Sequence, residues 1–393
     1  MTKSCLTGEV PFKVGGIVEP PYFVGRADDL AELSRDLRGL AQNRLILAPR
    51  RFGKSSLLHN LRLSVQTERD LLVPYVNCRD VVSYADFHRA TVSALLAELE
   101  RTRPVGGLVK RYAEVFKGRL TRALERLEEI GGAIGETGRV YLKFRDRTLD
   151  ERELARDTFR FFRALAEEKR VKIVFMLDEF QEVAAFDGYM FNLLKKELDL
   201  PSQVRYFFSG SSMRLIGRIF LHEEAPLYLM VSRHFMGPLR EDVVATFVQE
   251  RLALANLKIK PTAARRIHDQ TGGIPFYVQK LGAILVQRSL FDGTSVISVD
   301  HVERASRAMN DELDSEFEVR WLHRFSPLQR RIVHGLASLG QARVTELAAH
   351  IEAKPTDISS SLSRLREMMV IAQQEDGSYV LVDIVFARWL RKA

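Results

Sequence analysis

The segment that most restricts the fold lies at residues 45–55, where an apolar run leads into a glycine-lysine-serine motif. Leu45-Ile46-Leu47 is followed by the residues A-P-R-R-F-G-K-S, and Ser56-Leu57-Leu58 continue the pattern. This order predicts a buried strand, a phosphate-binding loop and then a helix, because backbone N–H groups at a helix N-terminus point toward anions. An α/β fold is the architecture that presents such a loop.

Each position of this loop has an expected task. Gly53 lets the backbone approach a phosphate without a Cβ in the way. Lys54 is expected to reach the β- and γ-phosphates, and the Ser55 hydroxyl to bind Mg²⁺. Ala48 stands where the motif normally has glycine, and the alternative interpretation is a basic surface turn before an amphipathic helix. The residues expected to contact the nucleotide are Ala48, Pro49, Arg50, Arg51, Phe52, Gly53, Lys54, Ser55 and Ser56.

A second motif, far along the chain, supplies two carboxylates. The apolar, β-branched run at residues 171–177 predicts a buried parallel strand, and Asp178-Glu179 follow it directly. Ligands of α/β sheets bind at the carboxyl ends of the strands. We expect Asp178 to hold the Mg²⁺ shell and Glu179 to act as the general base toward water. The alternative is a strand end that merely caps the next helix.

Two further strands are expected to complete the site. Residues 204–208 predict a third buried strand, after which either Ser209 or Ser211 would face the γ-phosphate. Arg233, before a short strand, could reach the phosphates of a nucleotide held by a neighbouring subunit, with Arg214 and Arg218 as competitors. A plain turn and a solvated arginine are the alternatives. The apolar segment 71–78 contains Pro74, which cannot donate to a ladder and therefore predicts an edge strand.

Composition narrows the class of protein without naming a function. The 393 residues carry a net charge of +8, which permits binding to nucleic acid but does not determine a fold. Cys5 and Cys78 lie far apart, and no cysteine-histidine spacing indicates a zinc site. We expect a cytoplasmic protein without membrane association, because the chain shows neither a signal-peptide pattern nor an apolar run long enough to cross a bilayer.

The order of patterns predicts three parts. Residues 1–238 are expected to form the nucleotide core, with a helical insertion at 83–170 that includes a charged helix through Leu120, Leu124 and Leu127. Residues 239–322 read as a helical lid. Residues 323–393 show three short helical patterns followed by a hairpin, which is typical of a winged helix.

The third helix of this tail has polar chemistry suited to nucleic acid. Serines and arginines on its polar positions suit phosphate contacts and base edges in a major groove. The alternative is a winged helix that contacts only proteins. The expected DNA-binding residues are Lys354, Ser359, Ser360, Arg364 and Arg366.

Taken together, these motifs resemble the archaeal-type ATPase family, which lies between the AAA+ origin-recognition ATPases and the STAND signalling ATPases. The resemblance spans nearly the whole chain and rests on F-V-G-R, A-P-R-R-F-G-K-S, M-L-D-E-F-Q, F-F-S-G-S-S, S-R before a short strand, T-G-G-I-P and the terminal winged helix.

The resemblance implies a P-loop NTPase of the AAA+ type, with a five-stranded parallel sheet, a helical lid and a winged helix. By the same resemblance, the turn that contains Pro275 would pack against the adenine, and Arg233 would be an arginine finger. The base side of the pocket would be lined by Phe23, Val24, Gly25 and Arg26. The lid lacks the arginine with which origin-recognition relatives sense phosphate, so hydrolysis is expected to be slow or to depend on a neighbouring subunit.

Two functional hypotheses follow. In the first, the protein binds ATP and Mg²⁺, hydrolyses ATP, and uses its nucleotide state to control DNA binding or assembly on DNA, as a homo-oligomer or with a protein partner. In the second, it is a nucleotide-gated switch that hydrolyses little and binds a protein partner through its tail or through the 83–170 segment. Phosphate release separates the two hypotheses.

Overall fold

The computed structural model describes residues 10–40, 42–102, 127–131, 141–144, 151–186 and 188–392. Contacts divide the chain into two compact units. We call residues 28–47 and 57–236 the sheet unit, and residues 1–27, 48–56 and 237–393 the lid unit. Each is described by itself. The predicted boundaries at 238 and 322 remain a proposal.

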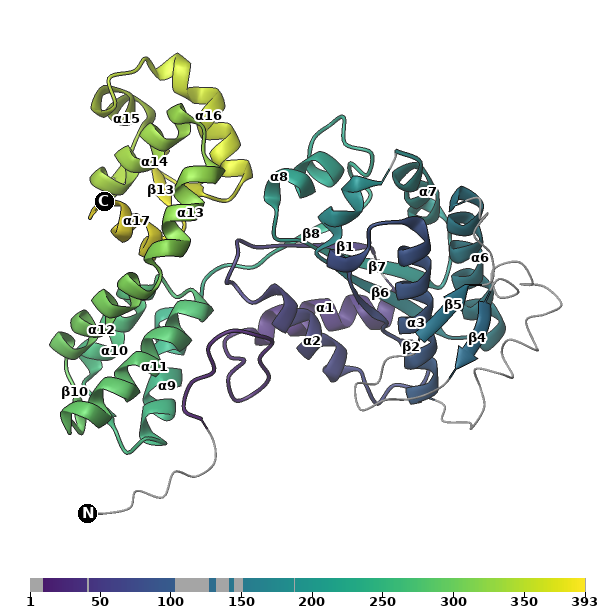
Figure 1. Ribbon diagram of the computed structural model, residues 1–393, viewed down its shortest axis with the longest axis horizontal. Helices are drawn as coiled ribbons and strands as arrows, with labels where there is room; N and C mark the ends of the chain where they lie inside the picture. The colour runs from purple at the N-terminus through teal and green to yellow at the C-terminus, as the bar shows by residue number, and fades with distance from the viewer. Residues whose placement is uncertain are drawn as a thin grey trace. The chain divides into compact units, whose positions relative to one another are not determined.

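A parallel sheet forms the centre of the sheet unit (Figure 1). In the described part of the chain, the strand order is β2-β6-β7-β1-β8, with β3 also paired to β6. Because β2 and β3 share one position, the sheet has five positions, and the predicted α/β fold class is confirmed. The strands are β1 (Arg44–Leu47), β2 (Leu71–Leu72), β3 (Tyr75–Asn77), β6 (Lys172–Asp178), β7 (Val204–Ser209) and β8 (Ser232–Phe235).

The edge strand next to β6 is interrupted at Pro74, as predicted. β2 and β3 each pair with β6, and the two residues between them leave the ladder. The Pro74 carbonyl still accepts a hydrogen bond of 2.8 Å from the Met176 N–H. Proline lacks an N–H, and an edge position is where its missing donor costs nothing.

Helices and aromatic rings cover this sheet. Helices α3 and α6 pack against each other, and α6 also packs against β6 and β7. Phe162 of α6 lies 4.3 Å from Phe175 of β6, and Phe175 stacks on Tyr206 of β7 at 5.8 Å between ring centroids. This buried aromatic layer joins α6 to the middle of β6 and β7. The helices that begin in or belong to this part are α1 (Ala27–Gly39), α2 (Lys54–Ser64), α3 (Tyr84–Thr102), α6 (Glu151–Lys169), α7 (Gly188–Asp199) and α8 (Met213–Ile216).

The prediction of a mostly helical 83–170 segment is only partly right. Helices α3 and α6 do lie in it, but it also contains an antiparallel pair, β4 (Leu127–Gly131) with β5 (Tyr141–Phe144). Leu127, expected in a helix, is therefore a strand residue. Leu120 and Leu124 lie outside the described residues.

The lid unit is mainly helical. Its central part packs α10 against α9 and α12, and α11 against α12. Pro275 stands in the first turn of α11, where its fixed φ suits a helix start. The elements of this part are α9 (Glu241–Ala253), β9 (Lys258–Ile259), α10 (Pro261–Thr271), α11 (Pro275–Asp292), β10 (Val296–Ile297), α12 (Val299–Glu312) and α13 (Asp314–Arg324).

The remainder of the lid unit has the element order of a winged helix. Helices α14, α15 and α16 pack on one another, and the strands order as β11-β13-β12, with β12 and β13 forming the hairpin. A further helix, α17, follows the hairpin and had no counterpart in the sequence analysis. These elements are α14 (Pro327–Leu339), β11 (Gln341–Ala342), α15 (Val344–His350), α16 (Pro355–Glu367), β12 (Ile371–Gln373), β13 (Tyr379–Leu381) and α17 (Ile384–Leu390). Among the described helices, none combines the length and the apolar character that a membrane span requires.

Candidate nucleotide site

Three neighbouring strands have their carboxyl ends on the same side of the sheet. β1, β6 and β7 run parallel, with Ile46 opposite Ser209 and Leu177 opposite Phe208. Asp178 is the last residue of β6, and Ser209 is the last residue of β7. Since Leu47 ends β1 and the glycine-lysine-serine loop follows it directly, the loop starts from the edge at which the carboxylates end.

Asp178 is buried, with 2% of its surface exposed, and its carboxylate is held by two hydroxyls. The Ser209 hydroxyl donates to Oδ1, and the Tyr75 hydroxyl donates to Oδ2 at 2.9 Å. Burial and the nearby charge of Asp178 raise the pKa of Tyr75, so this phenol stays a donor. Asp178 is thus fixed in orientation by side chains from the strands on either side of it.

Glu179 is enclosed by donors. Its Oε2 accepts hydrogen bonds from Gln181 Nε2 at 2.6 Å, from the Ser211 N–H at 3.1 Å and from the Ser211 hydroxyl at 2.7 Å. Arg79 lies 3.4 Å from Oε1. Burial alone would raise the pKa of Glu179, but these hydrogen bonds and the charge of Arg79 outweigh it, and the pKa lies below its ordinary value. A carboxylate with a lowered pKa is a weak base.

The loop itself, which belongs to the lid unit, holds its lysine inward. Lys54 Nζ donates to the carbonyl oxygens of Ala48 at 2.8 Å and Pro49 at 3.1 Å. Gly53 and Arg51 have φ values of +89° and +74°, in the left-handed region that favours glycine. The φ of Ala48 is not positive, so the backbone there does not need the glycine that the motif usually carries.

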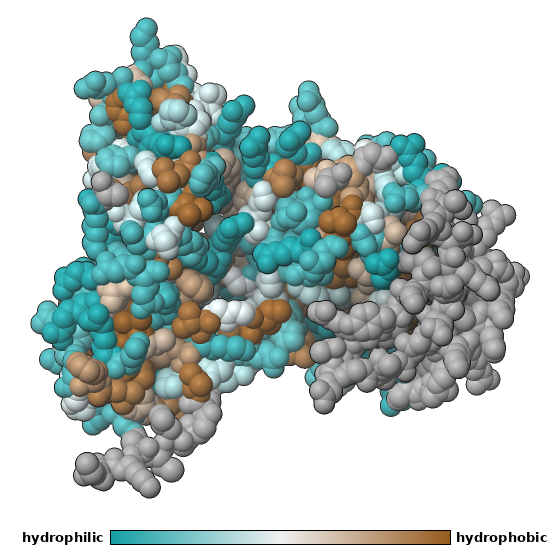
Figure 2. Space-filling view, viewed as in Figure 1, coloured by the Kyte–Doolittle hydropathy of each residue, from teal (hydrophilic) through white to brown (hydrophobic). Residues whose placement is uncertain are grey.

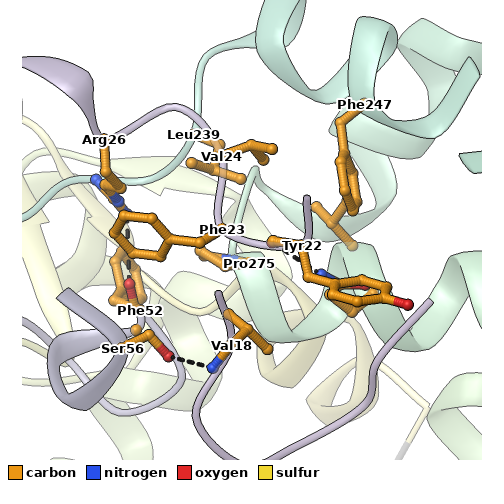
Figure 3. Close-up of a pocket in the computed structure, with 13 residues that line it drawn as sticks. Val18, Tyr22, Phe23, Val24, Arg26, Phe52, Ser56, Leu239, Phe247 and Pro275 are labelled. Atoms are coloured by element: carbon orange, nitrogen blue, oxygen red, sulfur yellow. Dashed lines mark hydrogen bonds between the residues drawn. The ribbon is translucent and has the colours of Figure 1, made fainter. Parts of the chain in front are cut away.

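A small, mainly apolar pocket lies beside this loop in the lid unit (Figure 3). It brings together seven predicted nucleotide-site residues: Phe23, Val24, Arg26, Phe52, Gly53, Ser56 and Pro275. In Figure 3 the Phe23 ring lies between the side chains of Arg26 and Phe52. An apolar slot next to a phosphate-binding loop suits a purine ring. The lining residues are Val18, Tyr22, Phe23, Val24, Arg26, Phe52, Gly53, Ser56, Leu239, Phe247, Pro275, Val278 and Gln279.

Hydrogen bonds fix the walls of this pocket. Arg26 is buried and donates to the carbonyls of Gly237 at 2.7 Å and Phe52 at 3.4 Å, so its guanidinium braces the loop. The Ser56 hydroxyl accepts from the Val18 N–H at 3.1 Å. Gly25 does not line the pocket but shapes it: its φ is +66°, and a Cβ there would come within 2.7 Å of Val243.

Four other predicted arginines are exposed. Arg233, Arg214 and Arg218 are exposed in the sheet unit, and Arg50 is exposed in the lid unit. Arg233 stands on β8 beside His234, whose ring is held by Asp29 of α1 at 2.8 Å. Ser209 and Ser211 prove to have different partners, Asp178 and Glu179, and the γ-phosphate sensor remains open between them.

Several site residues escaped the sequence analysis. Tyr75 and Gln181, which hold the two acids, stand in or beside recognised motifs but carry no local signal of their role. The pocket residues from α9 and α11 lie more than 200 residues from Phe23 in the sequence, although they line the same pocket. Those that were missed are Val18, Tyr22, Tyr75, Gln181, Leu239, Phe247, Val278 and Gln279.

The residues predicted to bind DNA lie together on the tail. Lys354, Ser359, Ser360, Arg364 and Arg366 are all exposed on or just before α16. Arg366 donates to Gln373 of the hairpin at 3.0 Å, which ties the helix to the wing. Figure 2 shows the visible surface of the α14–α17 part as largely hydrophilic, broken by small hydrophobic patches.

Comparison with solved structures identifies the class of fold. The chain superposes on the Walker-type ATPase paby2304 of Pyrococcus abyssi with a TM-score of 0.64 and 19% identity, covering 97% of this chain and all of that one. It superposes on the ORC2 protein of Aeropyrum pernix, in an ADPNP-ADP complex, with a TM-score of 0.56 and 14% identity over 97% of each chain. At these identities the likeness concerns the fold, which this chain shares with the Walker-type ATPase and with the ORC2 protein, and the predicted fold class is confirmed.

Sequence comparison adds a shorter match. A protein of Methanocaldococcus jannaschii, described as an uncharacterized HTH-type transcriptional regulator, is 26% identical over 153 residues. The match spans about a third of each protein, 37% of this chain and 36% of the relative. No family model matches the chain.

Proposed function

We propose that this protein binds ATP with Mg²⁺, hydrolyses the ATP, and uses its nucleotide state to control DNA binding by its tail. The observation that supports this most directly is the shared edge of β1, β6 and β7. There Asp178 ends β6 and Glu179 follows it, and the phosphate-binding loop follows β1, which is separated from β6 by β7. Lys54 would neutralise phosphate charge and Glu179 would orient and deprotonate water.

The residues present fit a Mg²⁺ ion that arrives with its nucleotide. In the described residues, no group of three or more histidine, cysteine, aspartate or glutamate side chains could hold a metal by itself. Mg²⁺ usually takes one or two protein oxygens together with phosphates and water. Ser55 and Asp178 would be those protein ligands, and the metal would supply charge neutralisation between the phosphates.

The DNA part of the proposal rests on α16. Five polar or basic side chains are exposed on or beside this helix, and the chain is basic overall. The regulator that is 26% identical over 153 residues is named for a helix-turn-helix. Lysine and arginine contacts to phosphates would supply the affinity, and the serines would approach base edges.

One observation favours the second candidate, a nucleotide-gated switch with little turnover. Glu179 has all its near donors in place and a lowered pKa, so it is a weak base in this conformation. In that case ATP or ADP would act as a conformational latch, and the tail or the 83–170 segment would bind a protein partner.

Nucleotide binding and phosphate release test the proposal together. We expect Lys54→Ala to weaken ATP binding by about 100-fold, because it removes a charged phosphate contact. Glu179→Gln should retain ATP and lower the hydrolysis rate by about 10² to 10⁴-fold, the usual range for loss of a general base. The measurements are isothermal calorimetry and released phosphate, with and without duplex DNA.

The matched control is Glu167→Gln, the same exchange at an exposed position of α6. ATP bound by the wild-type protein with no phosphate released, even with DNA, would reject hydrolysis in favour of the switch. Absence of ATP binding would reject both candidates.

A mixing experiment in the same assay tests Arg233. Mixing Arg233→Ala with Glu179→Gln protein should restore some turnover if Arg233 acts on a neighbouring subunit, and no recovery argues against that role.

A further inference from the structure

Arg51 belongs to the phosphate-binding loop by its backbone and to the lid by its side chain. Its guanidinium donates to the Tyr277 hydroxyl and pairs with Glu316 of α13. It also lies over three aromatic rings, 4.7 Å from Phe276, 4.9 Å from Tyr277 and 5.7 Å from Phe317. We call these three rings and Glu316 the arginine box. Arginine suits such a site because its planar cation stacks on rings while its N–H groups remain free to donate.

The backbone makes the position of this side chain depend on the shape of the loop. Arg51 has a φ of +74°, which a residue with a Cβ rarely adopts. The Phe276 N–H also approaches the Arg51 carbonyl, at 3.4 Å. Because the backbone and the side chain of one residue are both held, a change in the loop must either carry the guanidinium with it or break its contacts in the box.

Hydrogen bonds continue from the box to the end of the chain. The Tyr277 hydroxyl donates to Asp383 Oδ2 at 3.0 Å, and Arg320 of α13 donates to the same oxygen at 2.6 Å. The other oxygen of Asp383 accepts from the Phe386 N–H at 3.0 Å and so caps α17. Burial and the charge of Asp383 raise the pKa of Tyr277, which keeps its hydroxyl protonated as a donor.

Helix α17 is in turn fastened to the lid. Arg388 donates to the Gln270 carbonyl of α10 and to the Ser306 hydroxyl of α12, both at 3.1 Å. The Phe386 and Phe317 rings lie 5.4 Å apart, and Trp389 Nε1 donates to Asp314 at 2.6 Å. The last helix of the winged-helix part is therefore tied to the lid helices and to the arginine box at once.

We propose that Arg51 is the positioning residue that couples the phosphate-binding loop to the joined lid and winged-helix tail. This inference rests on the proposed function, since it concerns what nucleotide binding does to the tail. A ligand shifts a conformational equilibrium only through contacts that differ between the two states. The contacts that we expect to differ are those of the arginine box, which join the loop that would receive the phosphates to α17, the last helix of the tail.

The chain carries its own reporter for this coupling. It has two tryptophans, and both lie in the cluster next to the box. Trp389 is 5.9 Å from Phe317 and 5.8 Å from Phe386, and Trp321 is 6.5 Å from Phe386. A nucleotide that moves the box should therefore change tryptophan emission without any label.

The experiment titrates the full chain with Mg²⁺ and a slowly hydrolysed ATP analogue, and records tryptophan emission and affinity for duplex DNA. Each protein is compared at a nucleotide concentration that saturates it, as determined by calorimetry. In the wild-type protein we expect a spectral change and a shift in DNA affinity of about 5- to 150-fold, the range of ordinary allosteric coupling. Arg51→Gly, which suits the positive φ and removes the side chain, should abolish both responses.

Tyr277→Phe and Glu316→Gln keep Arg51 and remove one partner each, so they should reduce both responses even if Arg51→Gly does not fold. Lys280→Ala is the matched control, because it removes a surface cation from the same helix, α11, and leaves the box intact. Full responses in Arg51→Gly, or in both partner variants, would overturn the inference, as would wild-type protein that binds nucleotide with neither response. Wild-type protein that binds no nucleotide would instead overturn the proposed function and this inference with it.

Discussion

Glu179 combines an unfavourable backbone with a crowded side chain. Its φ of +52° places a residue with a Cβ in the left-handed region, at a cost of about 1–2 kcal/mol. Such conformations persist at functional sites when surrounding contacts determine them. Here Gln181 and Ser211 supply those contacts, and the same hydrogen bonds that hold the carboxylate also weaken it as a base.

Gln181 is the residue through which this restraint can be tested. Removal of its amide in Gln181→Met takes away the largest hydrogen-bonding cause of the lowered pKa of Glu179, so that pKa should rise. A base must be ionised to act, so the acidic limb of the hydrolysis rate should move to higher pH in the variant. The measurement is phosphate release across pH.

The control for this change is Gln203→Met, the same exchange at an exposed position in the sheet unit. If the acidic limb of the pH–rate profile is unchanged in folded Gln181→Met protein, the amide of Gln181 does not set the basicity of Glu179.

At the scale of elements, the sequence predicted well what depends on neighbouring residues. The run into Asp178 has the apolar, β-branched composition of a buried strand, and Pro74 excludes a central position, so both could be located without a structure. The β4–β5 pair could not, because L-E-E-I-G is rich in helix-forming residues and its strand state depends on partners 10 to 17 residues away. The pocket was half predictable for the same reason. Phe23 and Pro275 lie in motifs, whereas Phe247 and Gln279 reach the pocket only through packing.

The lid turn before α11 allows a sharp test of how closely the backbone approaches there. Gly273 has a φ of +65°, and a Cβ would meet the Leu239 carbonyl oxygen at 2.2 Å. Gly293, at the other end of α11, has the same φ of +65° but open space around a Cβ.

Both alanine variants carry the backbone cost of about 1–2 kcal/mol. We expect the free energy of unfolding of Gly273→Ala to fall by roughly a further 1–3 kcal/mol, as for overpacking, because a backbone oxygen must move. Urea unfolding measures the difference between the two variants. Equal losses would mean that the turn yields without cost.

At the scale of the whole molecule, contacts join the lid to the tail. The sequence suggested separate parts on either side of residue 322, but α17 returns to pack on α10 and α13 after the hairpin. No periodic sequence pattern predicts this packing of α17, because it depends on contacts between segments that are far apart in the sequence. The tail is therefore best regarded as an extension of the lid, and the proposed DNA contacts would belong to this larger body.

The proposed DNA contacts of the tail predict a specific salt dependence. Replacing both arginines in Arg364→Ala/Arg366→Ala should weaken duplex binding, because each variant position no longer neutralises a phosphate. The slope of log affinity against log salt should then fall by about one for each of these phosphates. Fluorescence anisotropy at several salt concentrations provides the measurement.

The control removes equal charge elsewhere. Arg304 and Arg307 are exposed on α12, and Arg304→Ala/Arg307→Ala should leave the slope near its wild-type value. If the slope is unchanged in the tail variant, or falls equally in the tail variant and in the control, α16 does not bind DNA.

The interrupted edge strand has a consequence for how the protein behaves in a crowded solution. An open sheet edge offers unpaired N–H and C=O groups to any passing chain, and native proteins blunt such edges with proline, charge and short strands. Pro74 divides this edge into segments of two and three residues, and the four-residue β8 carries Arg233 along the opposite edge. These short, interrupted edges disfavour strand-to-strand pairing between copies of this molecule and so protect it from growth into a fibril.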